Sequence, residues 1–123
     1  MSDFTVISRI RSVRFALRGI RWMLLTQHNA WIHAAATLVA VSAGAIFRID
    51  AHEWLVIVLA IMAVWTAEAL NTAFEALCDV ASPDFHPSVE RAKDVAAGAV
   101  LISAIGSVLV AVLIFGPRVA ALM

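Results

Sequence analysis

The chain has 123 residues, of which 63% are hydrophobic and 15% are charged, and its mean hydropathy is +0.92. Soluble globular domains carry about 25% charged residues, so this composition excludes that class and predicts an integral membrane protein. Nine Lys and Arg balance nine Asp and Glu, so the net charge identifies no partner, and we expect none among nucleic acids. The single cysteine, Cys78, excludes an intrachain disulfide. No internal repeat is visible, which predicts one domain over residues 1–123.

Residues 5–26 have the pattern of an amphipathic helix. Apolar residues recur at spacings of three and four, and four arginines occupy a neighbouring face of the same helix. The apolar positions are Val6, Ile10, Val13, Leu17, Ile20 and Leu24, and the basic ones are Arg11, Arg14, Arg18 and Arg21. Basic groups beside an apolar stripe are typical of a helix that lies on a membrane with anionic headgroups. We therefore expect an interfacial helix; a solvated basic face on a helix packed against a bundle is a compatible alternative.

Three apolar segments follow, and we expect them to be membrane spans at residues 30–48, 53–78 and 92–115. The predicted fold is therefore all-α, with three transmembrane helices and one surface helix. The apolar part of the second span, Trp54 to Ala67, has only fourteen residues. A spanning helix must therefore continue into the polar sequence that starts at Glu68.

Polar connections separate the predicted spans. A short turn that contains Arg48 and Asp50 follows the first span, and a longer connection from Asp79 to Asp94 follows the second. The longer one contains two prolines, Pro83 and Pro87, which do not belong in a helix interior. At the other end of the third span, we expect Gly116, Pro117 and Arg118 to end the helix.

The basic residues predict the orientation in the membrane. Five arginines precede the first span, and Arg91 and Lys93 lie in the second connection, whereas Arg48 and Arg118 are alone on the opposite side. Seven basic residues against two place the N-terminus in the cytoplasm. The end of the second span and the start of the third then meet at the cytosolic boundary.

Four polar residues, Glu68, Asn71, Glu75 and Asp79, fall within roughly 80° of one helix face, at about 100° per residue. Ionisable groups at membrane depth are costly and usually mark function. Carboxylates bind Mg²⁺ together with phosphate oxygens, and a partly buried carboxylate can accept a proton from an attacking hydroxyl. Glu68 is the deeper acid and suits proton transfer, while Glu75 suits metal binding. Lys93 offers a point charge for phosphate.

These residues alone leave more than one function open. Neither a P-loop nor a kinase glycine loop is present, so phosphate binding would have to come from side chains and metal. The acids could instead carry protons or ions in a small oligomeric transporter, or hold a noncatalytic oligomer together. A carrier usually needs a titratable group near the membrane midplane, whereas these acids gather toward one end of the helix.

Several motifs resemble one known family. The run A-E-A-L-N-T-A-F-E-A-L-C-D from Ala67 to Asp79, followed by His86 and then E-R-A-K-D at 90–94, resembles the signature of the prokaryotic diacylglycerol kinase family. This family also includes the undecaprenol kinases. F-A-L-R-G-I at 15–20 and H-N-A-W-I-H at 28–33 are similar to its first segment, so the resemblance covers nearly the whole chain.

The resemblance implies a homotrimer in a bacterial inner membrane, with composite active sites at the cytosolic membrane face. There, ATP with Mg²⁺ would phosphorylate a lipid alcohol, either diacylglycerol or undecaprenol. By position, the resemblance makes Glu68 the general base, Asn71 a support of the catalytic centre and Glu75 a metal ligand. It assigns the nucleotide and its phosphates to a further group, which is Lys93, Asp94, Asp79 and His86.

The chain departs from the family at Gln27, where a second metal-binding glutamate is common. A glutamine oxygen can bind Mg²⁺ but brings no negative charge, so weaker metal binding or a changed metal arrangement is expected. The H-N-A-W-I-H segment is closer to the undecaprenol kinase branch. We interpret His33 in this segment as a buried, hydrogen-bonded histidine, because no carboxylate is spaced with it as a second metal ligand. Trp65 is expected to pack close to the site.

Overall fold

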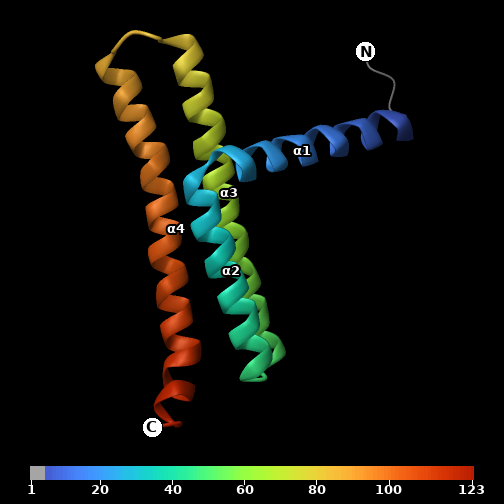
Figure 1. Cartoon of the computed structure of the whole chain (residues 1–123), viewed down its shortest axis with the longest axis vertical. Helices are drawn as coiled ribbons and strands as arrows, with labels where there is room; N and C mark the ends of the chain where they lie inside the picture. Colours follow the sequence, from blue (N-terminus) through green and yellow to red (C-terminus); the bar gives the residue numbers. More distant parts are fainter. Residues whose placement is uncertain (1–4) are drawn as a thin grey trace.

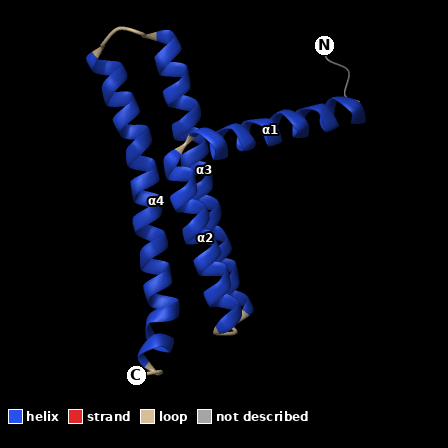
Figure 2. Ribbon diagram, viewed as in Figure 1, coloured by secondary structure: helices blue, strands red, loops and turns tan. Residues whose placement is uncertain are grey.

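The computed structural model describes residues 5–123, and this part of the chain contains helices and short loops but no strand. Its elements are α1 (Val6–Thr26), α2 (His28–Ile46), α3 (Ala51–Ala81) and α4 (Pro87–Ala120). Helices α2, α3 and α4 run alongside one another, whereas α1 projects across their long axis (Figure 1). Short loops join the helices (Figure 2). The first four residues of the predicted domain lie outside the described residues.

Helices α2, α3 and α4 are each long and apolar enough to cross a membrane. Most of their large apolar side chains are exposed on the single chain, as expected where lipid or another subunit covers them. The prediction of an all-α fold with three long apolar helices is confirmed. The exposed surface of α1 includes its four predicted basic positions, Arg11, Arg14, Arg18 and Arg21.

The bundle has a small core near the α2–α3 turn. Ile49, Ile57 and Ile114 are buried together, and the aromatic side chains of neighbouring residues pack against them. Gly44 of α2 permits close approach, because a Cβ at this position would lie only 2.6 Å from the Trp54 ring. This packing joins the end of α2 to the start of α3 and the last third of α4.

The corner between α1 and α2 directs α1 away from the bundle. Gln27 alone separates the two helices, and its backbone N–H donates to the Met23 carbonyl. The indole N–H of Trp31 donates to the Leu24 carbonyl at 2.8 Å, which ties the first turns of α2 to the last turn of α1. Met23 is the buried residue of α1, so α1 contacts the rest of the chain mainly through this end.

Two helix ends differ from the sequence expectation. Helix α3 continues to Ala81 and α4 begins at Pro87, so the predicted connection from Asp79 to Asp94 is reduced to residues 82–86. Proline is well accommodated at the first helical position, because the N–H that it lacks would have no hydrogen-bond partner within the helix there. The expectation that α4 ends near Pro117 is also wrong, because the helix continues to Ala120 with Pro117 inside it.

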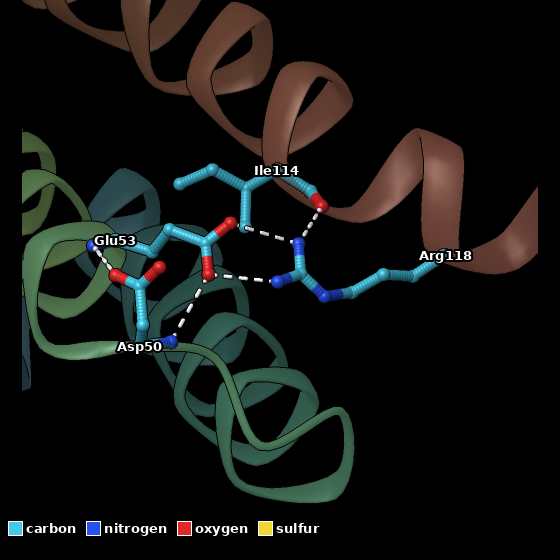
Figure 3. A network of polar contacts seen from close by, with 4 residues as sticks. All are labelled: Asp50, Glu53, Ile114 and Arg118. Atoms are coloured by element: carbon cyan, nitrogen blue, oxygen red, sulfur yellow. Dashed lines mark hydrogen bonds and ion pairs between the residues drawn. The ribbon is translucent and has the colours of Figure 1, made fainter.

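A polar network joins the start of α3 to the end of α4 (Figure 3). Asp50 and Glu53 form a capping box, in which each side chain accepts from the backbone N–H of the other residue. Arg118 donates to both carboxylate oxygens of Glu53, at 2.9 and 2.7 Å, and also to the Ile114 carbonyl. This network lies at the opposite end of the bundle from the α3–α4 loop (Figure 1).

Replacing Arg118 with alanine should lower the melting temperature by a few degrees in detergent. The variant loses a bidentate, charge-assisted pair and leaves the partly buried Glu53 carboxylate without its cation. Circular dichroism during heating measures the shift. Arg14→Ala, in the exposed face of α1, is the matched control and should melt as the parent does. Coincident melting curves for the Arg118→Ala variant and the parent would contradict this structural role.

Candidate functional site

The C-terminal half of α3 presents polar side chains to the inside of the bundle. Glu68, Asn71 and Thr72 are only 1%, 6% and 3% exposed, and Glu75 is half-buried. The Asn71 side-chain amide donates to Glu75 Oε1 at 3.5 Å. The helical spacing that grouped Glu68, Asn71 and Glu75 in the sequence therefore corresponds to one continuous face of α3.

Helix α2 brings His33 against Glu68. His33 Nε2 lies 3.3 Å from Glu68 Oε2, and the His33 side chain is 12% exposed. The two atoms are within ion-pair distance but are not aligned as a hydrogen bond, and neither has a hydrogen-bond partner elsewhere in the described part of the chain. The expectation of a buried, hydrogen-bonded histidine is therefore met only in its near burial, because Nε2 has no hydrogen bond. The sequence did not indicate the carboxylate beside it, which lies 35 positions later in the chain.

Trp65 supports this contact from one turn earlier on α3. Its ring meets the His33 ring edge-on, with 6.2 Å between the centroids, and its indole N–H donates to Thr37 Oγ1 at 3.0 Å. Thr37 lies one turn after His33 on α2. Two successive turns of α2 therefore face two successive turns of α3, and their side chains fix the orientation of the His33 ring.

A second polar cluster surrounds an open pocket of about 390 Å³ between the end of α3 and the start of α4. Lys93 donates to Asp79 Oδ1 across this pocket at 2.9 Å. His86 Nδ1 accepts from the backbone N–H of Ser88, which caps α4. Asp94 also lines the pocket. The four residues assigned to the nucleotide by resemblance thus share one pocket.

The two clusters lie along the same helix. Glu68 and Asp79 are about 16 Å apart along the α3 axis at 1.5 Å per residue, and Glu75 lies between them, about 6 Å before Asp79. Gln27 is half-buried at the α1–α2 corner, and its amide donates to Thr26 Oγ1 at 3.3 Å. Across residues 5–123 there is no hydrogen bond between Gln27 and Glu75.

The donor set fits a metal that arrives with phosphate. Among the described residues, no three His, Cys, Asp or Glu side chains are close enough to hold a metal on their own. Mg²⁺, however, commonly takes one or two carboxylates together with substrate phosphates and water. The Glu75 carboxylate is a suitable hard ligand, and the buried Asn71 Oδ1 next to it has no hydrogen-bond partner. A Mg²⁺ ion that also binds phosphate oxygens and water could therefore be held beside Glu75.

An apolar groove of about 410 Å³ begins beside His33 and follows the interior of the bundle between α2, α3 and α4. On α2 its lining extends from Ile32 to Ala43, about 16 Å along the helix axis. Alanines supply much of the lining, which leaves room for a narrow apolar chain. The groove thus leads from the apolar interior to the histidine that contacts Glu68.

The chain has long apolar helices, a buried carboxylate next to a histidine that lines an apolar groove, and a polar pocket that begins about 15 Å further along α3. These features define a small helical membrane protein with a site at one end of its bundle. The sequence model of prokaryotic diacylglycerol kinase matches residues 14–115, and the chain belongs to this family. The expected family is confirmed, and membership in it makes the protein a lipid kinase.

Individual relatives carry two different names. The chain is 37% identical over 108 residues to a Bacillus subtilis protein named undecaprenol kinase, and the match covers 88% of each chain. It is 34% identical over 113 residues to a Synechocystis diacylglycerol kinase, with 91% of this chain and 65% of the relative covered. It is also 29% identical over 100 residues to the Escherichia coli K12 diacylglycerol kinase, covering 81% and 82% of the two chains.

Proposed function

We propose that the protein transfers the terminal phosphate of ATP to the hydroxyl of a lipid alcohol, in a Mg²⁺-dependent reaction at the cytosolic face of a bacterial inner membrane. The observation that carries this proposal is the carboxylate of Glu68, which is 1% exposed and lies 3.3 Å from His33, a residue that lines an apolar groove. An apolar chain in this groove would bring its polar end to the proposed base. The pocket between the end of α3 and the start of α4 contains Lys93, a cation that can bind phosphate.

The proposed roles follow the order of residues along α3. Glu68 accepts the hydroxyl proton of the lipid as its oxygen attacks phosphorus. Asn71 holds Glu75 through their hydrogen bond, and Glu75, with Gln27 as a candidate second ligand, would hold Mg²⁺. The metal would neutralise charge on the transferring phosphate.

The nucleotide is proposed to occupy the pocket between α3 and α4. Lys93 would bind its phosphates, exchanging part of its contact with Asp79 for phosphate oxygens. Asp79, His86 and Asp94 surround the same space. Because the chain has no glycine-rich phosphate loop, these side chains and the metal must position the reactants, which is the main demand of phosphoryl transfer.

The proposed orientation agrees with the direction of α1. The α3–α4 hairpin continues past the α1–α2 corner (Figure 1), so a surface position for α1 would leave the pocket in water. His33 lies five residues after the start of α2, so Glu68 would be about 8 Å below this corner.

We propose that residues 30–48, 53–78 and 92–115 cross the membrane, that the N-terminus is cytoplasmic, and that three copies of this single kinase domain assemble.

Lipid phosphorylation in mixed micelles tests the proposed function. With radiolabelled ATP and millimolar Mg²⁺, we expect phosphate transfer to a lipid alcohol, and little transfer when Mg²⁺ is chelated. The higher identity to the protein named undecaprenol kinase favours undecaprenol, for which we expect a kcat/KM roughly tenfold or more above that for diacylglycerol. GTP in place of ATP measures the nucleotide preference. The absence of transfer to either lipid would reject the proposal.

A further inference from the structure

We propose that His33 is a positioning residue for Glu68, holding its carboxylate in the orientation in which one oxygen receives the proton of the lipid hydroxyl. This inference rests on the proposed role of Glu68 as general base. It adds a residue of α2 to a site otherwise built from α3 and α4.

The first argument is the isolation of Glu68. Its side chain is fully buried, and a buried carboxylate is unfavourable unless a cation or hydrogen-bond donor faces it. Asn71 donates instead to Glu75. In the part of the chain that the structure describes, the ion-pair partner of Glu68 is His33, at 3.3 Å.

The other helices bring no competing charge close to Glu68. Helix α1 contributes Met23 as its buried residue, and its arginines are outside the bundle. The charged residues at the start of α4 are near Asp79, as the Lys93–Asp79 contact shows, and Asp79 is about 16 Å along α3 from Glu68. On α3 itself the next acid, Glu75, is about 10 Å away along the axis.

The second argument is that the His33 ring packs against a side chain that is itself fixed by a hydrogen bond. The Trp65 ring packs edge-on against it, and the Trp65 indole is fixed in turn by its hydrogen bond to Thr37. A histidine that served only to fill space would not need this orientation. Here the packing keeps Nε2 at 3.3 Å from Glu68 Oε2.

The geometry defines the step that His33 assists. As the bond between the lipid oxygen and phosphorus forms, the bond from phosphorus to ADP breaks and the hydroxyl proton moves to Glu68. Later release of this proton to water restores the carboxylate. His33 exchanges no atoms in this step; it keeps Glu68 from rotating away from the lipid hydroxyl.

Two substitutions of similar size separate positioning from packing. His33→Gln retains a side-chain N–H donor, whereas His33→Leu fills the space without one. We expect His33→Leu to lower kcat by about 10- to 100-fold with little change in the KM for ATP, and His33→Gln to recover a large part of that loss. His52→Gln, on the exposed first turn of α3, is the histidine control and should retain the parent kcat.

Equal kcat values for the Gln and Leu variants, whether both unchanged or both reduced in step with the melting temperature, would overturn the positioning role. A spectroscopic measurement tests the contact without relying on activity. In protein labelled with ¹⁵N at its four histidines, Glu68→Gln should shift the His33 side-chain signal and leave the other three in place. An unchanged His33 signal would overturn the inference. If that signal shifts while the parent phosphorylates no lipid, the proposed function fails and the His33–Glu68 contact stands.

Discussion

Replacing Glu68 with glutamine should reduce kcat for lipid phosphorylation by about 10³-fold, within the range expected for removal of a general base. Glutamine has nearly the same shape as glutamate and keeps an oxygen that can face His33, but it cannot accept the hydroxyl proton. A 10³-fold loss corresponds to about 4 kcal/mol of transition-state stabilisation. Initial rates with saturating ATP and lipid, measured on protein that melts as the parent does, give this value.

Glu53→Gln is the control for this substitution. Glu53 is another glutamate of α3, is partly buried and has a cationic partner, but it lies in the first turn of that helix, at the opposite end of the bundle. Its variant should retain kcat within about twofold even if its melting temperature falls. Retention of most of the parent rate by the Glu68→Gln variant would exclude Glu68 as the base and direct attention to Glu75 or Asp79.

The sequence was sufficient to group Glu68, Asn71 and Glu75, because helical periodicity fixes which residues of one helix share a face. It was not sufficient for His33, whose partner lies on another helix. Antiparallel helices of known orientation predict that the start of α2 and the end of α3 are at similar depth. Which face of α2 meets α3 cannot be read from α2 itself, because it is apolar nearly all round and has no polar stripe.

The helix ends show a second limit of what the sequence could predict. Proline is a reliable breaker only in a helix interior, and Pro87 occupies the first position of α4, so the polar sequence after it is helical. Near the other end, Pro117 removes one backbone donor, yet the Arg118 side chain donates to the neighbouring Ile114 carbonyl. That contact depends on Glu53, which holds the guanidinium from α3. Rules that consider only neighbouring residues in the sequence could not predict this contact between α3 and α4.

Replacing Glu75 with glutamine should lower kcat by about 100-fold and raise the Mg²⁺ concentration for half-maximal activity by at least about tenfold. The variant keeps a side-chain oxygen that can accept the Asn71 hydrogen bond, but it loses the negative charge that a divalent cation prefers. Mg²⁺ titrations of the initial rate at fixed ATP measure both effects. Glu90→Gln, an exposed glutamate of α4, tests whether charge near the pocket has a general effect.

Gln27→Glu should change the Mg²⁺ requirement in the opposite direction. Gln27 is half-buried at the α1–α2 corner, and a carboxylate there would give the proposed second metal ligand a negative charge. We expect half-maximal activity at several-fold lower Mg²⁺. We also expect partial recovery when Gln27→Glu is combined with Glu75→Gln, because the charge available to the metal is restored. A double variant no better than Glu75→Gln would mean that residue 27 and residue 75 do not serve the same metal, and that Gln27 is a helix connector alone.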